Sequence, residues 1–408
     1  MFETILDFVL KYKIIILFYL VLGVIIFIYR KRFETQAKVI LLLRTKWGIA
    51  WMDRVSEKYR EWIILLGYIG IGVGFIGMGL IAFLLIKNLY DLMTVPTAVN
   101  TVSLVVPGIS IPGLGVLEFW HWIIMIFIIA VVHEFAHGVV ARAHNVEVKN
   151  TGFVLFGPIL GAFVEPNEKK MSKEKDTVQY SILAAGAFSN VILALLALLI
   201  LSVVIAPTYI DLNQQTQESV GFTFDKYDGK DLPIEKAGIK PGTLVMRVDG
   251  QRVNSFAEAQ TIISSKKPGD SITLTADGKD YIINLTSHPQ DNTRAYMGVY
   301  APHDVRMMKE EYVGTRTGFY FNIIDEARAF FSWLSMLSLG IGLFNLLPLP
   351  IVDGGRMVQT FMRKLKGQVV GDKVYIKIGF FFLFLLALNL TYQYIAQGIS
   401  YLLNLIGA

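Results

Sequence analysis

Long apolar stretches recur along the chain and are separated by shorter polar segments. The hydrocarbon core of a bilayer is about 30 Å thick, and a helix needs roughly 20 apolar residues to cross it. Six stretches approach this length: 12–29, 62–86, 120–141, 178–206, 327–347 and 374 to about 393. The pattern therefore predicts a polytopic α-helical membrane protein with about six transmembrane helices.

The pattern changes between Pro207 and about His303, where apolar and polar residues alternate as they do in short strands. This region predicts an inserted soluble α+β domain. Residues 31–61 differ again, because they form a basic, amphipathic stretch with Trp47, Trp51 and the apolar run 39–43. Such a stretch is typical of helices that lie on a membrane surface.

Charge in the connecting segments predicts how the chain is oriented, since short loops rich in Lys and Arg stay in the cytoplasm. Residues 30–61 carry nine basic side chains against four acidic ones, whereas residues 87–118 carry one basic side chain. The segments 142–177 and 356–377 carry six basic side chains each. We expect these three basic segments inside the cell and residues 207–325 outside it.

Composition limits the chemistry that the chain can perform. Of its 408 residues, 54% are apolar and 17% are charged, which is typical of a protein with lipid around it. The chain has no cysteine, so disulfides, thiol nucleophiles and Cys-ligated metals are excluded. The net charge is +5, and the basic residues lie beside apolar runs. We therefore expect contact with membrane lipid and no nucleic acid as a partner.

A metal-binding pattern lies near the cytoplasmic end of the third predicted span. His133 and His137 are four residues apart and therefore share one helix face, from which both imidazoles can bind one ion. Glu134 lies between them, where it can reach a water molecule at the metal. Ionisable groups within a span cost at least a few kcal/mol, so three in five residues predict a function.

A third ligand is expected after the fifth predicted span. Residues 345–355 contain Pro348 and Pro350, which break the helix and leave backbone groups that lipid cannot satisfy. This broken segment must line a protein or water cavity. Asp353 begins the next helix, and Gly354 and Gly355 allow neighbouring chain to approach closely. The alternative interpretation is that the prolines only end one helix and that Asp353 only caps the next.

Together the two segments resemble the site-2 protease family of intramembrane metalloproteases, whose paired signatures are H-E-x-x-H and N-x-x-P-x-P-x-x-D-G. The resemblance covers residues 120–395 and implies that His133, His137 and Asp353 bind Zn²⁺ while Glu134 is the general base. The resemblance also implies substrate-binding residues: Asn345, Asn190 (with Gly186 in a glycine-and-asparagine pattern), and Gly161, Ala162 and Phe163 in a membrane-dipping β-hairpin at 152–165. The alternatives are that Asn190 bonds a neighbouring helix and that the hairpin is a structural plug over the site.

The inserted region has its own resemblance. The segments 237–242 and 244–250, a helical stretch at 256–264 and a turn at Gly269 resemble a PDZ domain over about 90 residues. Such domains bind a peptide or chain terminus by adding a strand to a sheet edge. Residues 219–222 are our candidate for the receiving loop, and a spacer or size-filter role for the domain is the alternative.

Four regions follow from these assignments: two amino-terminal transmembrane helices with a basic cytoplasmic segment (1–119), the first half of a catalytic core (120–206), an extracytoplasmic PDZ-like domain (207–305), and the second half of the core (306–408). The hypothesis is a multi-pass cell-membrane protease, with its active site near the cytoplasmic side, that cuts transmembrane protein substrates. An ion-coupled transporter or channel could use Asp353 and the broken helix, and a non-catalytic PDZ scaffold is a third hypothesis.

Overall fold

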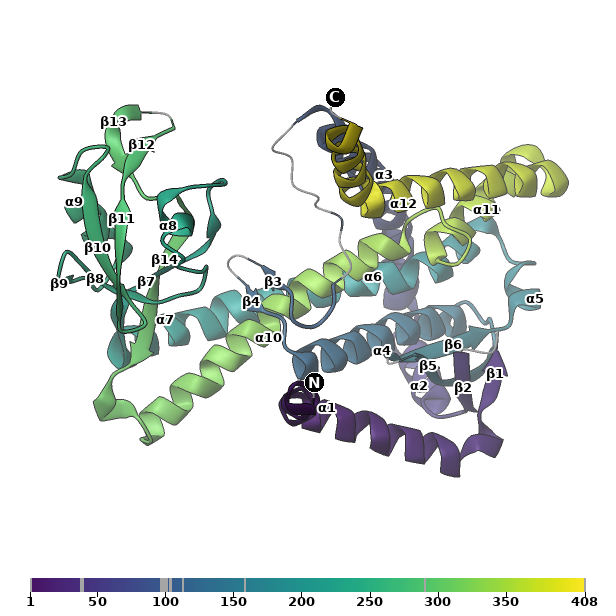
Figure 1. Cartoon of the computed structure of the whole chain (residues 1–408). Helices are drawn as coiled ribbons and strands as arrows, with labels where there is room; N and C mark the ends of the chain where they lie inside the picture. Colours follow the sequence, from purple (N-terminus) through teal and green to yellow (C-terminus); the bar gives the residue numbers. More distant parts are fainter. Residues whose placement is uncertain are drawn as a thin grey trace. The chain divides into compact units, whose positions relative to one another are not determined.

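The structure is a computed structural model that describes residues 2–36, 40–95, 102, 105–111, 114–157, 159–289 and 291–406. The chain divides into two compact units (Figure 1). Unit 1 comprises residues 1–201 and 329–408, and unit 2 comprises residues 202–328.

Unit 1 is mainly helical. Its helices are α1 (Phe2–Ile28), α2 (Ile49–Lys58), α3 (Arg60–Thr94), α4 (Phe119–Ala143), α5 (Glu168–Met171), α6 (Asp176–Ile200), most of α10 (Arg316–Asn345), α11 (Asp353–Lys366) and α12 (Gln368–Ile406), and a 3₁₀ turn covers Arg30–Arg32. Its strands are β1 (Glu34–Gln36), β2 (Ile40–Thr45), β3 (Ser110–Ile111), β4 (Gly115–Val116), β5 (Val148–Phe156) and β6 (Ile159–Pro166).

Five of the described helices are long and apolar enough to cross a membrane: Arg60–Thr94, Phe119–Ala143, Asp176–Thr216, Arg316–Asn345 and Gln368–Tyr392. They correspond to five of the six predicted spans. The first predicted span falls in α1, where the shorter stretch Tyr12–Ile28 is apolar. The count of six transmembrane helices therefore stays a prediction.

Helix α3 packs closely on the rest of unit 1 through a row of glycines three and four residues apart. Gly67, Gly70, Gly74 and Gly77 are buried. A Cβ atom on Gly70 would lie 3.3 Å from Phe188 of α6, and one on Gly74 would lie 3.2 Å from Cβ of Ala184. Small residues allow helix backbones to approach in this way, so α3 belongs to the same bundle as α4 and α6.

A buried polar pair joins α3 to α12. The side-chain amide of Asn88 donates to the Asn389 side-chain oxygen at 2.7 Å, and Asn389 donates in turn to the carbonyl oxygens of Leu385 and Leu85. Polar groups in apolar surroundings must find such partners. This pair fixes the depth at which the two helices meet.

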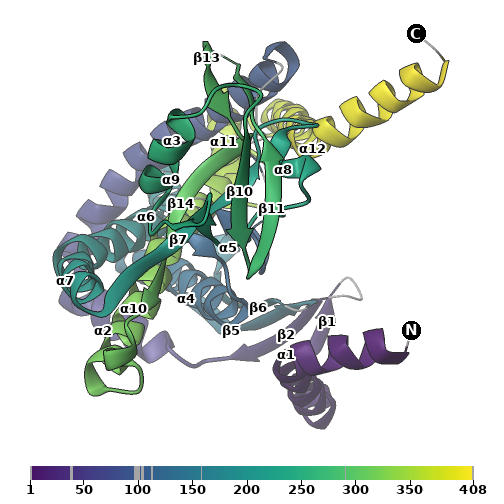
Figure 2. The same cartoon turned by 60° about the vertical axis from the view of Figure 1, so that its left-hand side comes forward.

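A four-stranded antiparallel sheet, in the order β1-β2-β5-β6, lies within unit 1 (Figure 2). Strands β5 and β6 form the hairpin expected at 152–165, with Phe153 opposite Ala162.

The prediction of surface helices throughout 31–61 is wrong for residues 34–36 and 40–45, which are strands β1 and β2. These strands pair with each other and β2 pairs with β5, so non-local pairing outweighs the helical pattern. Only 49–58 forms the expected amphipathic helix, α2, and Val39 lies outside the described residues.

Unit 2 is an α+β unit. Its helices are α7 (Ala206–Thr216), which follows a π turn at Leu201–Ile205, α8 (Pro233–Lys236) and α9 (Phe256–Ser264), with a 3₁₀ turn at Glu310–Tyr312 and the start of α10. Its strands are β7 (Gln217–Tyr227), β8 (Val245–Val248), β9 (Gln251–Arg252), β10 (Ser271–Ala276), β11 (Lys279–Asn284), β12 (Thr286–His288), β13 (Asp291–Tyr296) and β14 (Val299–Met308).

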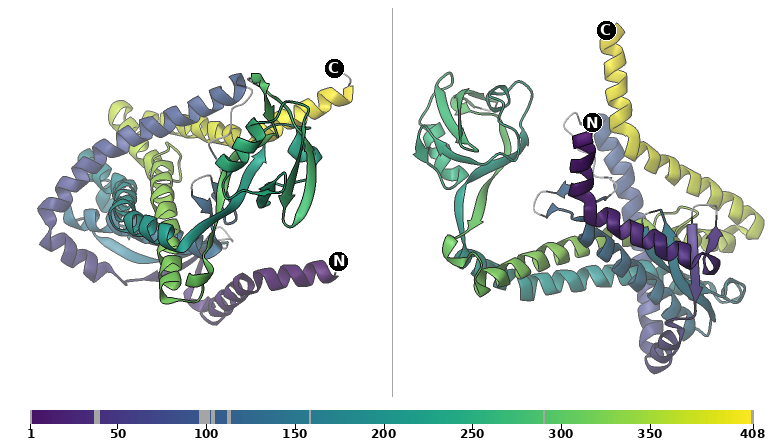
Figure 3. Two further views of the ribbon diagram at one scale, coloured as in Figure 1. Left: turned by 90° about the vertical axis from the view of Figure 1, so that its left-hand side faces the viewer. Right: turned by 60° about the horizontal axis from the view of Figure 1, so that its bottom comes forward.

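The main sheet of unit 2 has the strand order β11-β10-β8-β7-β14, with β9 beside β8. Its two longest strands, β7 and β14, run side by side (Figure 3), and Phe222, Phe224, Ile272 and Leu274 form part of its buried core. The candidate receiving loop at 219–222 is wrong, because these residues lie within β7, which pairs with β8 and β14. Among the described strands, β14 forms the sheet edge on that side.

The glycine row of α3 gives a test of the helix packing. Gly74→Leu would force a side chain into Ala184 and Met357, and we expect it to lower the free energy of unfolding by about 1–3 kcal/mol. Gly72→Leu on the same helix is the matched control, because a Cβ there meets nothing within 4 Å. Thermal unfolding of the detergent-solubilised protein measures both, and equal melting temperatures would contradict the packing.

Candidate metal centre

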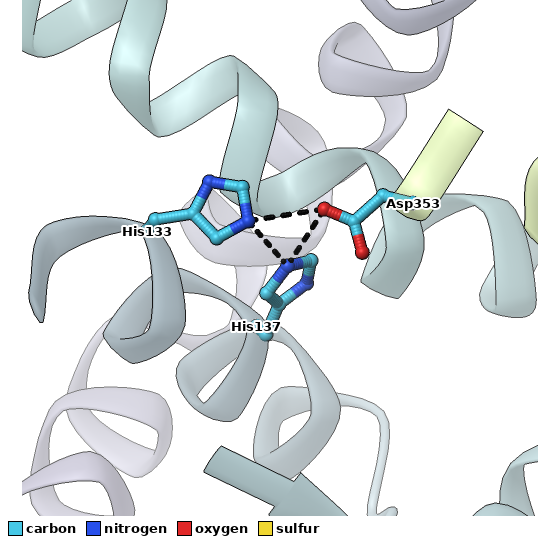
Figure 4. A group of neighbouring side chains, drawn as sticks. All are labelled: His133, His137 and Asp353. Atoms are coloured by element: carbon cyan, nitrogen blue, oxygen red, sulfur yellow. Dashed lines mark hydrogen bonds and ion pairs between the residues drawn. The ribbon is translucent and has the colours of Figure 1, made fainter. Parts of the chain in front are cut away.

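Three predicted ligands meet at one point in unit 1. Nε2 of His133 and Nε2 of His137 lie 3.2 Å apart, and Oδ2 of Asp353 lies 3.0 and 3.2 Å from them (Figure 4). Both imidazoles are buried, with 7% and 8% of each residue exposed. The structure thus brings together groups that are 220 residues apart in the chain.

Local sequence explains why the three side chains converge. The two histidines occupy successive turns of α4, so their side chains lie on one face. Asp353 is the first residue of α11, and the segment that contains the two prolines separates this helix from α10. A Cβ on Gly354 would lie 2.1 Å from the Leu346 carbonyl oxygen, and one on Gly355 would lie 1.8 Å from that of Leu349. Glycine is therefore required at both positions for Asp353 to reach the histidines.

Hydrogen bonds orient the two imidazoles. Nδ1 of His137 lies 2.7 Å from the Ile182 carbonyl oxygen, which can only accept, so Nδ1 carries the proton and Nε2 keeps its lone pair. Nδ1 of His133 lies 3.2 Å from the side-chain amide of buried Asn190. Among the residues that the structure describes, none hydrogen-bonds the Asn190 side-chain oxygen, and rotating the amide by 180° would let it accept from Nδ1–H of His133. Both Nε2 atoms then face the same point as ligands.

The triangle of ligand atoms has the size that a small metal ion requires. The centre of a triangle with sides of 3.0, 3.2 and 3.2 Å lies about 1.8 Å from each corner, close to the 2.0–2.1 Å of a zinc–nitrogen bond. Gly186 of α6 leaves the space in front of this triangle open. A Cβ there would lie 2.4 Å from Nε2 of both histidines, where an ion would have to sit. The donor set of two imidazoles and one carboxylate fits zinc.

Glu134 lies beside the triangle and is held by the hairpin. Its Oε2 accepts a hydrogen bond from the backbone N–H of Val164 in β6 at 2.9 Å. Glu134, His137 and Asp353 line a cavity of about 250 Å³, which is also lined by Arg356 and Glu168. Arg356 and Glu168 form an ion pair at 3.0 Å. A carboxylate therefore faces a space that can admit water next to the three ligands.

Of the other predicted site residues, Asn190, Ala162 and Phe163 lie near this centre. Asn190 contacts a ligand histidine, as described above. Ala162 and Phe163 of β6 line a second cavity that also reaches Glu134, and Gly161 pairs with Val154 within the hairpin. Asn345 is the half-buried last residue of α10. The structure does not bring Asn345 or Gly161 into the ligand triangle.

Sequence reasoning missed several groups that support the centre. The Ile182 carbonyl and the Val164 N–H are backbone atoms, so no residue type could have signalled them. Arg356 follows the Asp-Gly-Gly segment directly, and a basic residue at that position was a usable signal. The tilted aromatic pair of Trp51 and Phe135, which lines a cavity with Glu134, had no signal in the local pattern.

Comparisons with known proteins identify a family for the part of the chain that contains these ligands. Residues 121–386 match the model of peptidase family M50. An uncharacterized protein of Methanocaldococcus jannaschii is 23% identical over 360 residues, which cover 87% of each chain. The zinc metalloprotease RasP of Geobacillus kaustophilus is 26% identical over 38% of this chain, and that of Shouchella clausii is 24% identical over 42%.

Coverage differs between these relatives. The chain spans 87% of the Methanocaldococcus protein but about half of the two RasP proteins, namely 47% and 51% of their lengths. Among solved structures, the PDZ domain of an SdrC-like protein from Listeria monocytogenes is similar at 19% identity. The match covers 23% of this chain and 92% of that domain, with a TM-score of 0.18.

The family match spans well over half of the chain and includes both motif segments with all three converging ligands. It confirms the resemblance to site-2 proteases that the motifs indicated. The chain belongs to peptidase family M50.

Proposed function

We propose that this chain is a zinc endopeptidase that cleaves peptide bonds within or beside the transmembrane segments of other membrane proteins. The observation that carries the proposal is the convergence of His133, His137 and Asp353 beside Glu134, on helices apolar enough to span a bilayer. Zinc is the metal named in the relatives from Geobacillus and Shouchella. The donor set described above agrees with that metal.

Zinc supplies a Lewis acid that polarises a carbonyl group and makes water acidic enough to ionise near neutral pH. The protein supplies the proton transfers. Glu134 is placed to take a proton from the attacking water and to return it to the leaving amine. Its hydrogen bond from Val164 holds one carboxylate oxygen, which leaves the other available for water in the cavity.

The β6 edge is our proposed site for the scissile segment. In an antiparallel pair, alternate residues point their N–H and C=O groups to the same side. Because the N–H of Val164 points away from β5 and toward Glu134, the backbone groups of Ala162 face the same open edge. An extended substrate pairing along Gly161–Phe163 would therefore pass beside Glu134. Asn345, at the end of α10, is the proposed second contact for the substrate backbone.

We further propose that the metal centre lies near the cytoplasmic face and that unit 2 is extracytoplasmic. The basic side chains at 30–61, 142–177 and 356–377 support this orientation. Unit 2 would select substrates, either by excluding bulky outer domains or by binding a peptide or chain terminus. The open side of β14 is the proposed acceptor edge in place of 219–222.

The role of Glu134 can be separated from metal binding. Glu134→Gln removes the proton acceptor but no ligand, so cleavage of a single-span model peptide should fall by roughly 100- to 10,000-fold. Bound zinc, measured by mass spectrometry of the purified protein, should stay unchanged. Glu147→Gln, at an exposed carboxylate paired with Lys170, is the control that should cleave normally. Undiminished cleavage by Glu134→Gln would refute the proposed reaction.

The open space at Gly186 can be tested with one methyl group. Gly186→Ala places a Cβ where the ion must sit, and we expect zinc affinity to drop by at least about 100-fold, the upper end of losses seen when a ligand's supporting contact is removed. Gly340→Ala, where a Cβ meets nothing within 4 Å, should keep its zinc. Equal zinc content in the two variants would show that the ion does not bind in front of Gly186.

Removal of most of unit 2 tests its selecting role. Glu218 and Met307 are Cα partners in the β7–β14 ladder, so residues 219–306 can be replaced by a short Gly-Ser linker between them. We expect the shortened protein to cut substrates with and without a folded outer domain equally well, whereas the full chain discriminates between them. An unaltered preference would argue against any selecting role.

A further inference from the structure

Two aromatic side chains stand between Glu134 and the apolar helix surface. The rings of Trp51 in α2 and Phe135 in α4 have centroids 4.3 Å apart and an angle of 31° between their planes. Trp51 keeps 57% of its surface exposed although it is a large aromatic residue. Trp51, Phe135 and Glu134 line the same cavity, so the aromatic pair lies beside the Glu134 carboxylate.

On one side of the aromatic pair lies the cavity that reaches β6. It has a volume of about 370 Å³ and is lined by Glu134 together with Gly152, Ala162, Phe163 and Val164. Residues of β2, β5 and β6 line this cavity, so an extended chain within it would lie against the sheet and reach Glu134.

On the other side lies an apolar groove, also of about 370 Å³, between α3, α4 and α6. Leu66, Val139, Phe188 and Ile192 are among its lining residues, and almost all of its surface is apolar. Trp51, Val131 and Phe135 line both spaces. The groove and the cavity are therefore neighbouring compartments with a shared aromatic wall.

The two compartments can hold different backbone conformations. Apart from the Ser189 hydroxyl, which donates to the Gly186 carbonyl oxygen, and the indole N–H of Trp51, the described side chains that line the groove are apolar. A peptide lying against it must therefore satisfy its backbone internally, as a helix does. Strand β6 borders the cavity, and its edge offers backbone partners, so a peptide bound there is held extended. A substrate that occupies both must change from helix to extended chain where it crosses the wall.

We propose that the groove between α3, α4 and α6 binds the helical part of a transmembrane substrate, and that the Trp51–Phe135 pair sets the point at which its helix ends and the extended scissile segment begins. This inference rests on the proposed function. It makes Trp51 a positioning residue that determines which bond reaches Glu134.

The absence of cysteine allows a direct binding test. In the Glu134→Gln background, Leu66→Cys places a thiol in the groove, and Leu65→Cys places one on the neighbouring residue, which is exposed and does not line the groove. Each full-length protein in lipid nanodiscs is oxidised with a single-span peptide that carries one cysteine in its helix. We expect a several-fold higher disulfide yield at position 66. Equal yields would mean that the groove holds lipid and would overturn the proposal.

The position of cleavage tests the aromatic wall. With Trp51→Ala we expect mass spectrometry to show cleavage spread over neighbouring bonds, within about one helical turn of three to four residues. Trp51→Phe should restore a single cut, and Trp62→Ala, at an exposed tryptophan that lines neither compartment, should leave it unchanged. A single unshifted cut by Trp51→Ala overturns this proposal but leaves the protease assignment intact. No cleavage by the unsubstituted chain would instead count against the assignment itself.

Discussion

The contact between two imidazoles of α4 and one carboxylate at the start of α11 is the constraint on which the rest of unit 1 depends. Ionisable groups at membrane depth cost several kcal/mol each when nothing compensates them. The surrounding structure places these groups within 3.2 Å of one another. The proline-broken segment, the two glycines after Asp353 and the hydrogen bonds behind each histidine all serve that meeting point.

Some parts of the site depend only on which residues lie a few positions apart in the chain, and these parts could be predicted from the sequence. Histidines four residues apart share a helix face wherever a helix forms, and two prolines break a span regardless of its neighbours. The same holds for five of the apolar stretches, whose length alone predicts a spanning helix. Asp353 could be predicted because a carboxylate that follows a broken helix at membrane depth needs a cation or a metal ion to compensate its charge.

Features that depend on distant partners could not be predicted in this way. Residues 40–45 read as amphipathic, but pairing with β5 more than 100 residues later makes them a strand. Residues 219–222 read as a loop, but β14 converts them into the interior of a sheet. The backbone groups of Ile182 and Val164 carry no side-chain signal at all. The glycine spacing of α3 is visible in the sequence, whereas its packing partner, α6, is not.

The long separation of the metal ligands along the chain has a consequence for biosynthesis. Residue 353 leaves the ribosome 220 residues after residue 133, when α4, α6 and α10 have already been made. A nascent chain therefore holds only two of the three ligands during most of its translation. The complete set of three ligands therefore exists only after residue 353 has been made, in the last part of synthesis.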